Sequence, residues 1–138
     1  KYASWRETGG LNDGQYVPIL RSADGYLLVA EAKFRSGHYG ETELNAVRQR
    51  AGLSPITGAT MDDIIHERRV ELAGENQRHQ DLIRWDKAGL VDIVAIYAED
   101  RGTFDPSRNF QRPKHYLFAI PQREIDLSNG VLEQNPDY

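Results

Sequence analysis

An arginine lies inside the apolar stripe of the most regular helical pattern in the sequence, the segment 60–75. On a 3.6-residue period, Arg68 falls on the same face as Met61, Ile64, Ile65 and Leu72. A solvent-exposed helix would place its charges opposite the apolar residues, yet Glu71 and Glu75 lie along the edge of this stripe. The chain must therefore fold so that the arginine meets acidic partners, because an unpaired buried charge is strongly destabilising.

Charged residues continue at the same density up to residue 84. Glu71 is within reach of Arg68 on the same helix, and acids on a neighbouring helix could supply the two-pronged contact that a guanidinium favours. We interpret these charges as a partly buried structural ion network that fixes helix register, and hence as part of a scaffold. The predicted members are Glu67, Arg68, Glu71, Glu75, Arg78, Asp81 and Arg84.

The other periodic segments also predict helices, which are separated by short loops containing glycine or proline. This pattern is typical of a mostly α fold built from antiparallel helix pairs. Thr60 and Asp63 have the spacing of a capping box. In the first helix, Leu28 and Val29 lie outside the main apolar stripe, so we expect this helix to be covered on more than one side. The predicted helices span residues 18–34, 41–51, 60–75, 78–87 and 90–99, the last of which lacks a clear period.

After residue 99 the sequence predicts an irregular C-terminal part. Residues 100–113 are polar, and Pro121 is expected to open a short helical turn. The segment 116–120 is extended in character, and we expect its alternating apolar residues to dock the C-terminal segment onto the helices. These residues are Tyr116, Phe118 and Ile120.

The length of 138 residues suits one domain. We divide it into a loop (1–17), a helical scaffold (18–99) and an irregular C-terminal segment (100–138). The chain begins at Lys1 inside a polar, glycine-containing stretch with no signal peptide, so we expect it to be part of a longer protein. Its net charge of −4 argues against nucleic-acid binding, and no apolar run approaches the roughly 18–20 residues that span a bilayer.

Neither a metal site nor a catalytic site is predicted. His66 and Glu67 begin the zinc-protease motif H-E-x-x-H, but Val70 occupies the position of the second histidine. The absence of cysteine excludes disulfides, thiolate catalysis and cysteine-based zinc sites. No serine has the setting of a catalytic triad, and no phosphate-binding glycine motif occurs. A pair of catalytic carboxylates is not testable from spacing. We therefore expect no cofactor.

Four segments resemble, in order and spacing, the C-terminal part of the SusD/RagB-like family of nutrient-binding lipoproteins. They read "PILRSADGYLLVAEA", "ELNAVRQRAGL", "IIHERRVELAGENQRHQDLIRW" and "YLFAIPQREIDLSNGVLEQNPDY". The resemblance covers roughly residues 16–138. It implies a tetratricopeptide-like helical scaffold that contacts the C-terminal tail, and it assigns recurrent family positions to that scaffold. In this sequence they are Arg21, Glu31, Glu67, Arg68, Glu71, Arg78, Asp81, Arg84 and Trp85.

The sequence departs from the family pattern at three places. Gly25 lies inside the first predicted helix and Gly74 inside the third, which indicates local looseness or a close backbone approach. His79 and Gln80 replace residues that are commonly aromatic, which indicates looser packing of that face.

The resemblance implies a cell-surface protein, lipid-anchored in the outer membrane, that captures a glycan or another nutrient and passes it to a SusC-like TonB-dependent transporter. It implies no enzymatic activity, and it places most of the ligand site outside the present chain. Two other interpretations stay open at this point. One is a helical-repeat adaptor that binds protein segments, and the other is a carbohydrate hydrolase, which would need two acids converging in a cleft.

Overall fold

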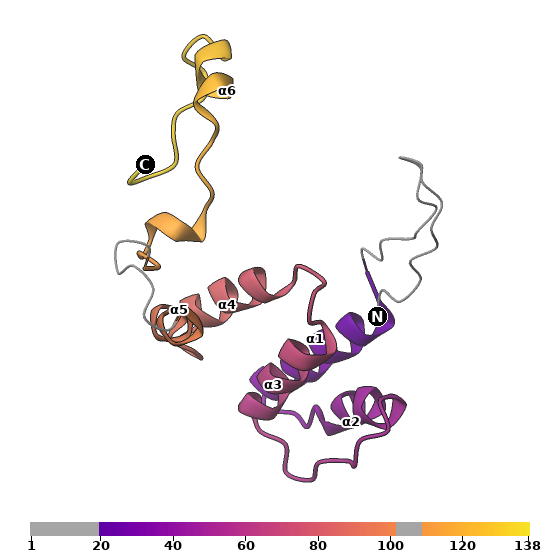
Figure 1. The fold of residues 1–138 in the computed structure, drawn as a ribbon. Coiled ribbons are helices and arrows are strands. Elements are labelled where there is room, and N and C mark those ends of the chain that lie inside the picture. Colours follow the sequence, from indigo (N-terminus) through magenta and orange to yellow (C-terminus); the bar gives the residue numbers. More distant parts are fainter. Residues whose placement is uncertain (1–19, 102–108) are drawn as a thin grey trace, which may run out of the picture. The chain divides into compact units, whose positions relative to one another are not determined.

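The computed structural model describes residues 20–101 and 109–138, and all regular elements in these ranges are helical (Figure 1). The chain divides into two compact units, Lys1–Asn76 and Gln77–Tyr138. The prediction of a mostly α fold is confirmed, whereas the one-domain organisation remains a prediction. The elements are α1 (Ser22–Arg35), α2 (Glu41–Arg50), α3 (Met61–Glu71), α4 (Arg78–Lys87), α5 (Ile93–Arg101), the 3₁₀ turn η2 (Lys114–Tyr116) and α6 (Gln122–Leu127).

In the first unit, α1 contacts both α2 and α3 (Figure 1). The apolar stripe predicted for the first helix supplies one side of the core, with Leu27 and Ala30 fully buried. α2 contributes Leu44 and α3 contributes Ile64, both also inaccessible to solvent. Amphipathic helices of this length gain most of their stability from such packing. The three helices are therefore expected to stabilise one another, with α1 in contact with both α2 and α3.

The first helix begins later than predicted. Arg21 is the N-cap residue, and its extended backbone (φ −128°, ψ 152°) places it before the helix rather than inside it. Its side chain instead reaches the end of α3, where it bonds to Glu71 and Glu75. A start at Pro18 is therefore wrong. Pro18 itself and the predicted loop 1–17 lie outside the described residues.

The third helix ends earlier than predicted, at Glu71 instead of Glu75. Gly74 and Asn76 have left-handed backbones, with φ values of 79° and 59°, which a right-handed helix cannot include. The glycine at position 74 is thus a turn residue, and the expectation that it lies within the helix was wrong. At the other end of α3, the predicted capping box is confirmed: Asp63 accepts a hydrogen bond from the Thr60 N–H, and the Thr60 hydroxyl accepts one from the Asp63 N–H.

Two glycines in the first unit have opposite surroundings. A Cβ atom at Gly40 would lie 2.3 Å from the carbonyl oxygen of Ala30, so the start of α2 approaches α1 too closely for any side chain. At Gly25, within α1, an added Cβ would meet no atom of the described residues within 4 Å. A glycine in a helix interior costs about 1 kcal/mol relative to alanine. The packing of the described residues explains why position 40 is a glycine, but it does not explain the glycine at position 25.

In the second unit, α4 contacts α5, and the segment after residue 109 is built from short turns. Most of the ambiguous segment 90–99 is a helix, as predicted, but the helix begins at Ile93 rather than at residue 90 and extends to Arg101. Tyr116 belongs to the 3₁₀ turn η2 rather than to an extended run, because the Tyr116 N–H bonds back to the carbonyl of Pro113. The extended backbone begins only at Leu117. Pro121 directly precedes α6, in agreement with the predicted helical turn.

Candidate functional site

Arg68 is buried between α3 and α1, with 2% of its surface exposed. One of its terminal guanidinium nitrogens lies 2.8 Å from a carboxylate oxygen of Asp24 on α1. Asp24 is itself 8% exposed, so the pair is almost completely withdrawn from water. The sequence indicated that Arg68 needs an acidic partner, but it did not identify Asp24, which precedes it by 44 residues.

Three acids of the segment 64–75 meet arginines from the other helices. Glu67 lies 2.7 Å from Arg48 of α2, and Glu75 lies 2.7 Å from Arg21 at the start of α1. Glu71 contacts Arg21 at 2.9 Å and also binds Arg50 at the end of α2. The hydrogen bond that Arg21 donates to Glu75 is the main factor that raises the pKa of Arg21. Four members of the predicted network, from Glu67 to Glu75, therefore come together with oppositely charged residues of neighbouring elements.

The other three members lie on α4, in the second unit. Asp81 and Arg84 pair with each other at 2.9 Å, and the Arg84 guanidinium lies over the ring of Trp85, 4.8 Å from its centre. Arg78 stands at the start of the same helix. Trp85 is fully buried, which agrees with a packing role for this face. That all seven residues serve as one register-fixing network remains our proposal.

Asp86 forms a second polar centre, which the sequence did not predict. Its carboxylate accepts hydrogen bonds from the Arg112 guanidinium (2.6 Å from Nε), from the Tyr116 hydroxyl and from the backbone N–H of Ile93 at 2.9 Å. Arg112 also lies 2.7 Å from Asp92, which precedes α5. The hydrogen bond from Arg112 is the largest of the effects that hold the pKa of Asp86 well below its usual range. Asp86 thus connects α4, α5 and the segment 112–116.

We expect Asp86→Asn to lower the melting temperature at neutral pH. The melting temperature of the variant should also fall less steeply than that of the parent as the pH is lowered. A carboxylate whose pKa is depressed in the folded state stabilises the fold above its unfolded pKa, about 4, and loses that contribution as the pH falls further. Melting curves between about pH 2.5 and pH 7 test this. The exposed Asp126, whose side chain among the described residues accepts a hydrogen bond from Gln122 of the same helix, supplies the control Asp126→Asn. If the melting temperatures of the parent and of Asp86→Asn fall in parallel as the pH is lowered, the Asp86 carboxylate does not stabilise the fold.

Aromatic side chains surround the half-buried His79 in the same unit. Its Nδ1 atom lies 2.7 Å from the Tyr97 hydroxyl, and its ring lies 5.5 Å from that of Phe118 and 6.3 Å from that of Phe110. Tyr97 stacks on Phe110 at 5.7 Å. The imidazole therefore takes part in an aromatic cluster, whereas Gln80 is exposed, and the looser packing expected for this face remains a prediction.

The C-terminal residues hold the extended backbone after η2 with side-chain amides. The Gln134 amide donates to the carbonyl of Ile120 and accepts from its N–H, at 2.9 and 2.8 Å. Asn135 donates to the carbonyl of Phe118 at 2.6 Å, and the Tyr138 hydroxyl donates to that of Leu117 at 2.9 Å. We call these three side chains the C-terminal clamp. Phe118 itself remains 74% exposed, so the predicted docking edge is covered only in part.

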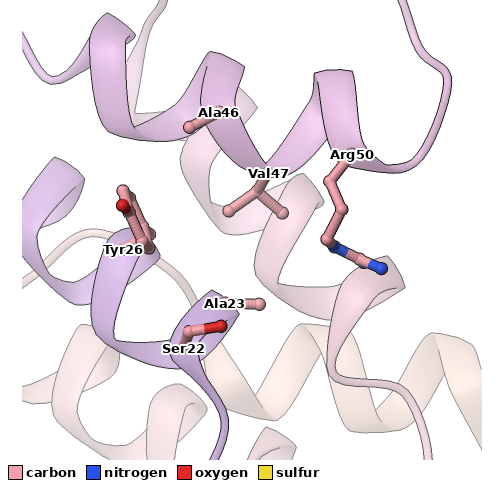
Figure 2. A pocket seen from close by; sticks show the side chains of 6 residues that line it. All are labelled: Ser22, Ala23, Tyr26, Ala46, Val47 and Arg50. Carbon is pink, nitrogen blue, oxygen red and sulfur yellow. The ribbon is translucent and has the colours of Figure 1, made fainter.

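A small pocket lies between α1 and α2 in the first unit, with a volume of about 170 Å³ (Figure 2). Ser22, Ala23 and Tyr26 line it from α1, and Ala46, Val47 and Arg50 line it from α2. Its one charged residue, Arg50, already binds Glu71. Within residues 20–101 and 109–138, no three side chains of the metal-binding types gather in one place. His66 is exposed on α3.

Three comparisons with known proteins bear on these observations. The SusD family model matches residues 1–138. The starch-binding protein SusD of Bacteroides thetaiotaomicron is 34% identical over 134 residues, which cover 88% of this chain and 21% of that protein. The structure of surface glycan-binding protein A from the same organism matches with a TM-score of 0.63 and 35% identity, over 88% of this chain and 25% of that one. Its complex with laminarihexaose matches with a TM-score of 0.62, at 35% identity over 86% and 24% of the two chains.

The chain belongs to the SusD family. The resemblance found in the sequence is thereby confirmed, as is the expected tetratricopeptide-like helical fold. The names of these relatives are those of binding proteins, in agreement with the prediction of no enzymatic activity. The chain spans only between 13% and 26% of the length of the curated relatives that it matches. Among the described residues, no helix is long and apolar enough to cross a membrane.

Proposed function

We propose that this chain is part of a cell-surface glycan-binding protein and supplies mainly its helical scaffold. The observation that carries the proposal is the match to the SusD family over all 138 residues, together with the structural similarity to a surface glycan-binding protein. One of the matching structures is a complex of that glycan-binding protein with laminarihexaose. A glycan is therefore the ligand class that we assign to the whole protein.

The scaffold role is supported by the burial of charged side chains on α3, which pair with residues of neighbouring helices. Glu67, Arg68 and Glu71 are between 2% and 7% exposed, and they form ion pairs with Arg48, Asp24 and Arg50 of neighbouring helices. A side chain buried in this way cannot also donate to, or accept from, a sugar hydroxyl. The glycan site of the whole protein is then made by other residues, which is also what the family resemblance implies.

The further steps of the proposed function concern the whole protein. It is anchored by a lipid in the outer membrane, faces the cell exterior, and passes its glycan to a SusC-like TonB-dependent transporter. Affinity purification of the full-length protein from outer membranes tests the partnership. Recovery of a TonB-dependent barrel supports the proposal, whereas recovery of the protein from the cytoplasm, without any outer-membrane partner, argues for a helical-repeat adaptor.

We expect Trp85→Phe and Arg84→Lys in the full-length protein to leave glycan affinity within about threefold of the parent. Both residues lie on α4, where Trp85 is fully buried and Arg84 pairs with Asp81. Calorimetric titration with laminarihexaose and with starch oligosaccharides measures the effect. If either variant loses more than about tenfold in affinity while its melting temperature is unchanged, this stretch contacts the ligand and the scaffold role is wrong.

A further inference from the structure

A single Asn-Gly pair occurs in the sequence, Asn129-Gly130, and it lies in the turn that joins α6 to the C-terminal clamp. Both residues are exposed, and both have left-handed backbones, with φ values of 52° and 85°. A left-handed conformation is uncommon for residues other than glycine, and asparagine is one of the few that tolerate it. The conformation of the turn accounts for both residue types, and it presents them to water.

The peptide group between these two residues is loosely held. Neither the N–H of Gly130 nor the carbonyl of Asn129 forms a hydrogen bond within the described residues. The backbone bond that closes the turn, from the Val131 N–H to the Ser128 carbonyl, is long at 3.3 Å. Because glycine has no side chain, nothing on Gly130 hinders access to its nitrogen. The peptide group can therefore rotate toward the Asn129 side chain, as an attack by its nitrogen requires.

We propose that Asn129 is a site of spontaneous deamidation and isomerisation, and that this modification loosens the C-terminal clamp. In the first step, the Gly130 nitrogen attacks the side-chain carbonyl carbon of Asn129, and a succinimide ring forms. The side-chain nitrogen leaves as ammonia, which carries away the proton that the Gly130 amide loses. Water then opens the ring at either of its carbonyl carbons, which gives aspartate or isoaspartate at position 129. The net change is uptake of water and release of ammonia, so the reaction needs no cofactor.

The other asparagines in the described residues lack this combination of features. Asn135 is followed by proline, whose nitrogen carries no hydrogen in a peptide and cannot attack in this way. Asn45 lies inside α2, and its side-chain amide is bonded to a backbone N–H and a backbone carbonyl. Asn76 and Asn109 precede residues with large side chains, glutamine and phenylalanine, which hinder the following nitrogen. Position 129 is therefore expected to react first.

Isoaspartate at position 129 changes the connection between α6 and the clamp. Its main chain runs through the former side chain, which lengthens the backbone by a methylene group and adds a negative charge at neutral pH. Gln134 lies a few residues further on, and its amide binds both backbone groups of Ile120, at 2.8 and 2.9 Å. A longer turn displaces the side chains that hold this backbone, so the modified protein loses part of the clamp.

Peptide mapping by mass spectrometry tests the modification in the full-length protein. The folded protein is incubated in a mildly alkaline buffer, and the fraction of each asparagine that is deamidated is followed over time. Deamidation of Asn129 is expected to be at least about tenfold faster than that of Asn135, because proline blocks the same attack. Isoaspartate, identified by fragmentation and by its resistance to an aspartate-specific protease, is expected among the products. Conversion of Asn129 that is no faster than that of Asn135, or that occurs only in urea, overturns the proposal.

The effect on the clamp is measured on the same incubated samples. Incubation is expected to lower the melting temperature of the parent by about 2 °C or more. Asn129→Gly is the matched control, because glycine keeps the left-handed turn but has no side-chain amide to react. Its melting temperature is expected to stay constant over the same period. Equal losses in the two proteins, or no loss in a parent sample that is mostly converted at Asn129, overturn the proposed loosening of the clamp.

Discussion

Arg68→Ala is expected to destabilise the first unit by about 3–5 kcal/mol, the usual cost of removing one partner from a buried ion pair. The guanidinium is 2% exposed and lies 2.8 Å from the Asp24 carboxylate, which would remain buried without its counter-ion. Urea unfolding of the parent and the variant measures the difference, with the slope of the transition checked for constancy.

Arg69→Ala on the same helix is the matched control, since Arg69 is exposed. Its expected cost is below about 1 kcal/mol, the range of surface ion pairs. The double variant Arg68→Ala with Asp24→Ala closes a cycle, and it should cost clearly less than the sum of the two single changes. A cost below about 0.5 kcal/mol for Arg68→Ala would mean that the pair is solvated and that the buried-network interpretation fails.

Removal of residues 114–138 is expected to abolish cooperative unfolding of the second unit. The deletion takes away the Tyr116 hydroxyl from Asp86 and the rings of His115 and Tyr116 that contact Phe110. Phe110 is only 7% exposed, and its return to water costs about 25 cal/mol per Å² of apolar area. Thermal unfolding of the full-length protein, monitored by circular dichroism and by tryptophan fluorescence, to which the buried Trp85 contributes, reports the loss.

Leu127→Ala supplies the control for the deletion. It lies in the same segment, on α6, but is 64% exposed, so its expected effect is within about 0.5 kcal/mol. A deletion variant that melts as cooperatively as the parent, at the same temperature, would show that the C-terminal segment contributes no stability to α4 and α5.

The sequence was most informative where a short local pattern, such as helical periodicity or capping-box spacing, determines the structure. The position of Arg68 in the apolar stripe of α3 predicted its burial, and the capping box predicted where α3 begins. Gly74 was misplaced because a glycine after three helical turns fits both an interior and an end. The left-handed backbones at Gly74 and Asn76 show that the helix has stopped.

Partners that are far apart in the chain could not be predicted in this way. Asp24 precedes Arg68 by 44 residues, and Arg112 follows Asp86 by 26, and no periodicity links the members of either pair. Their meeting depends on how the helices pack and on the turns around η2, which are properties of tertiary structure. The family resemblance identified the charged positions of the scaffold, but it did not pair them.

The side chains of the C-terminal clamp bind backbone groups rather than side chains. The residues whose backbone is bound and the residues that bind it should therefore differ in their tolerance to substitution. Gln134 binds the N–H and the carbonyl of Ile120, groups that almost every amino acid at position 120 would also present. We therefore expect substitutions to be tolerated better at the positions whose backbone is held than at Gln134, whose side chain holds it. Gln134→Glu keeps the shape but loses the donor to the carbonyl, so even this closest exchange releases half of the contact.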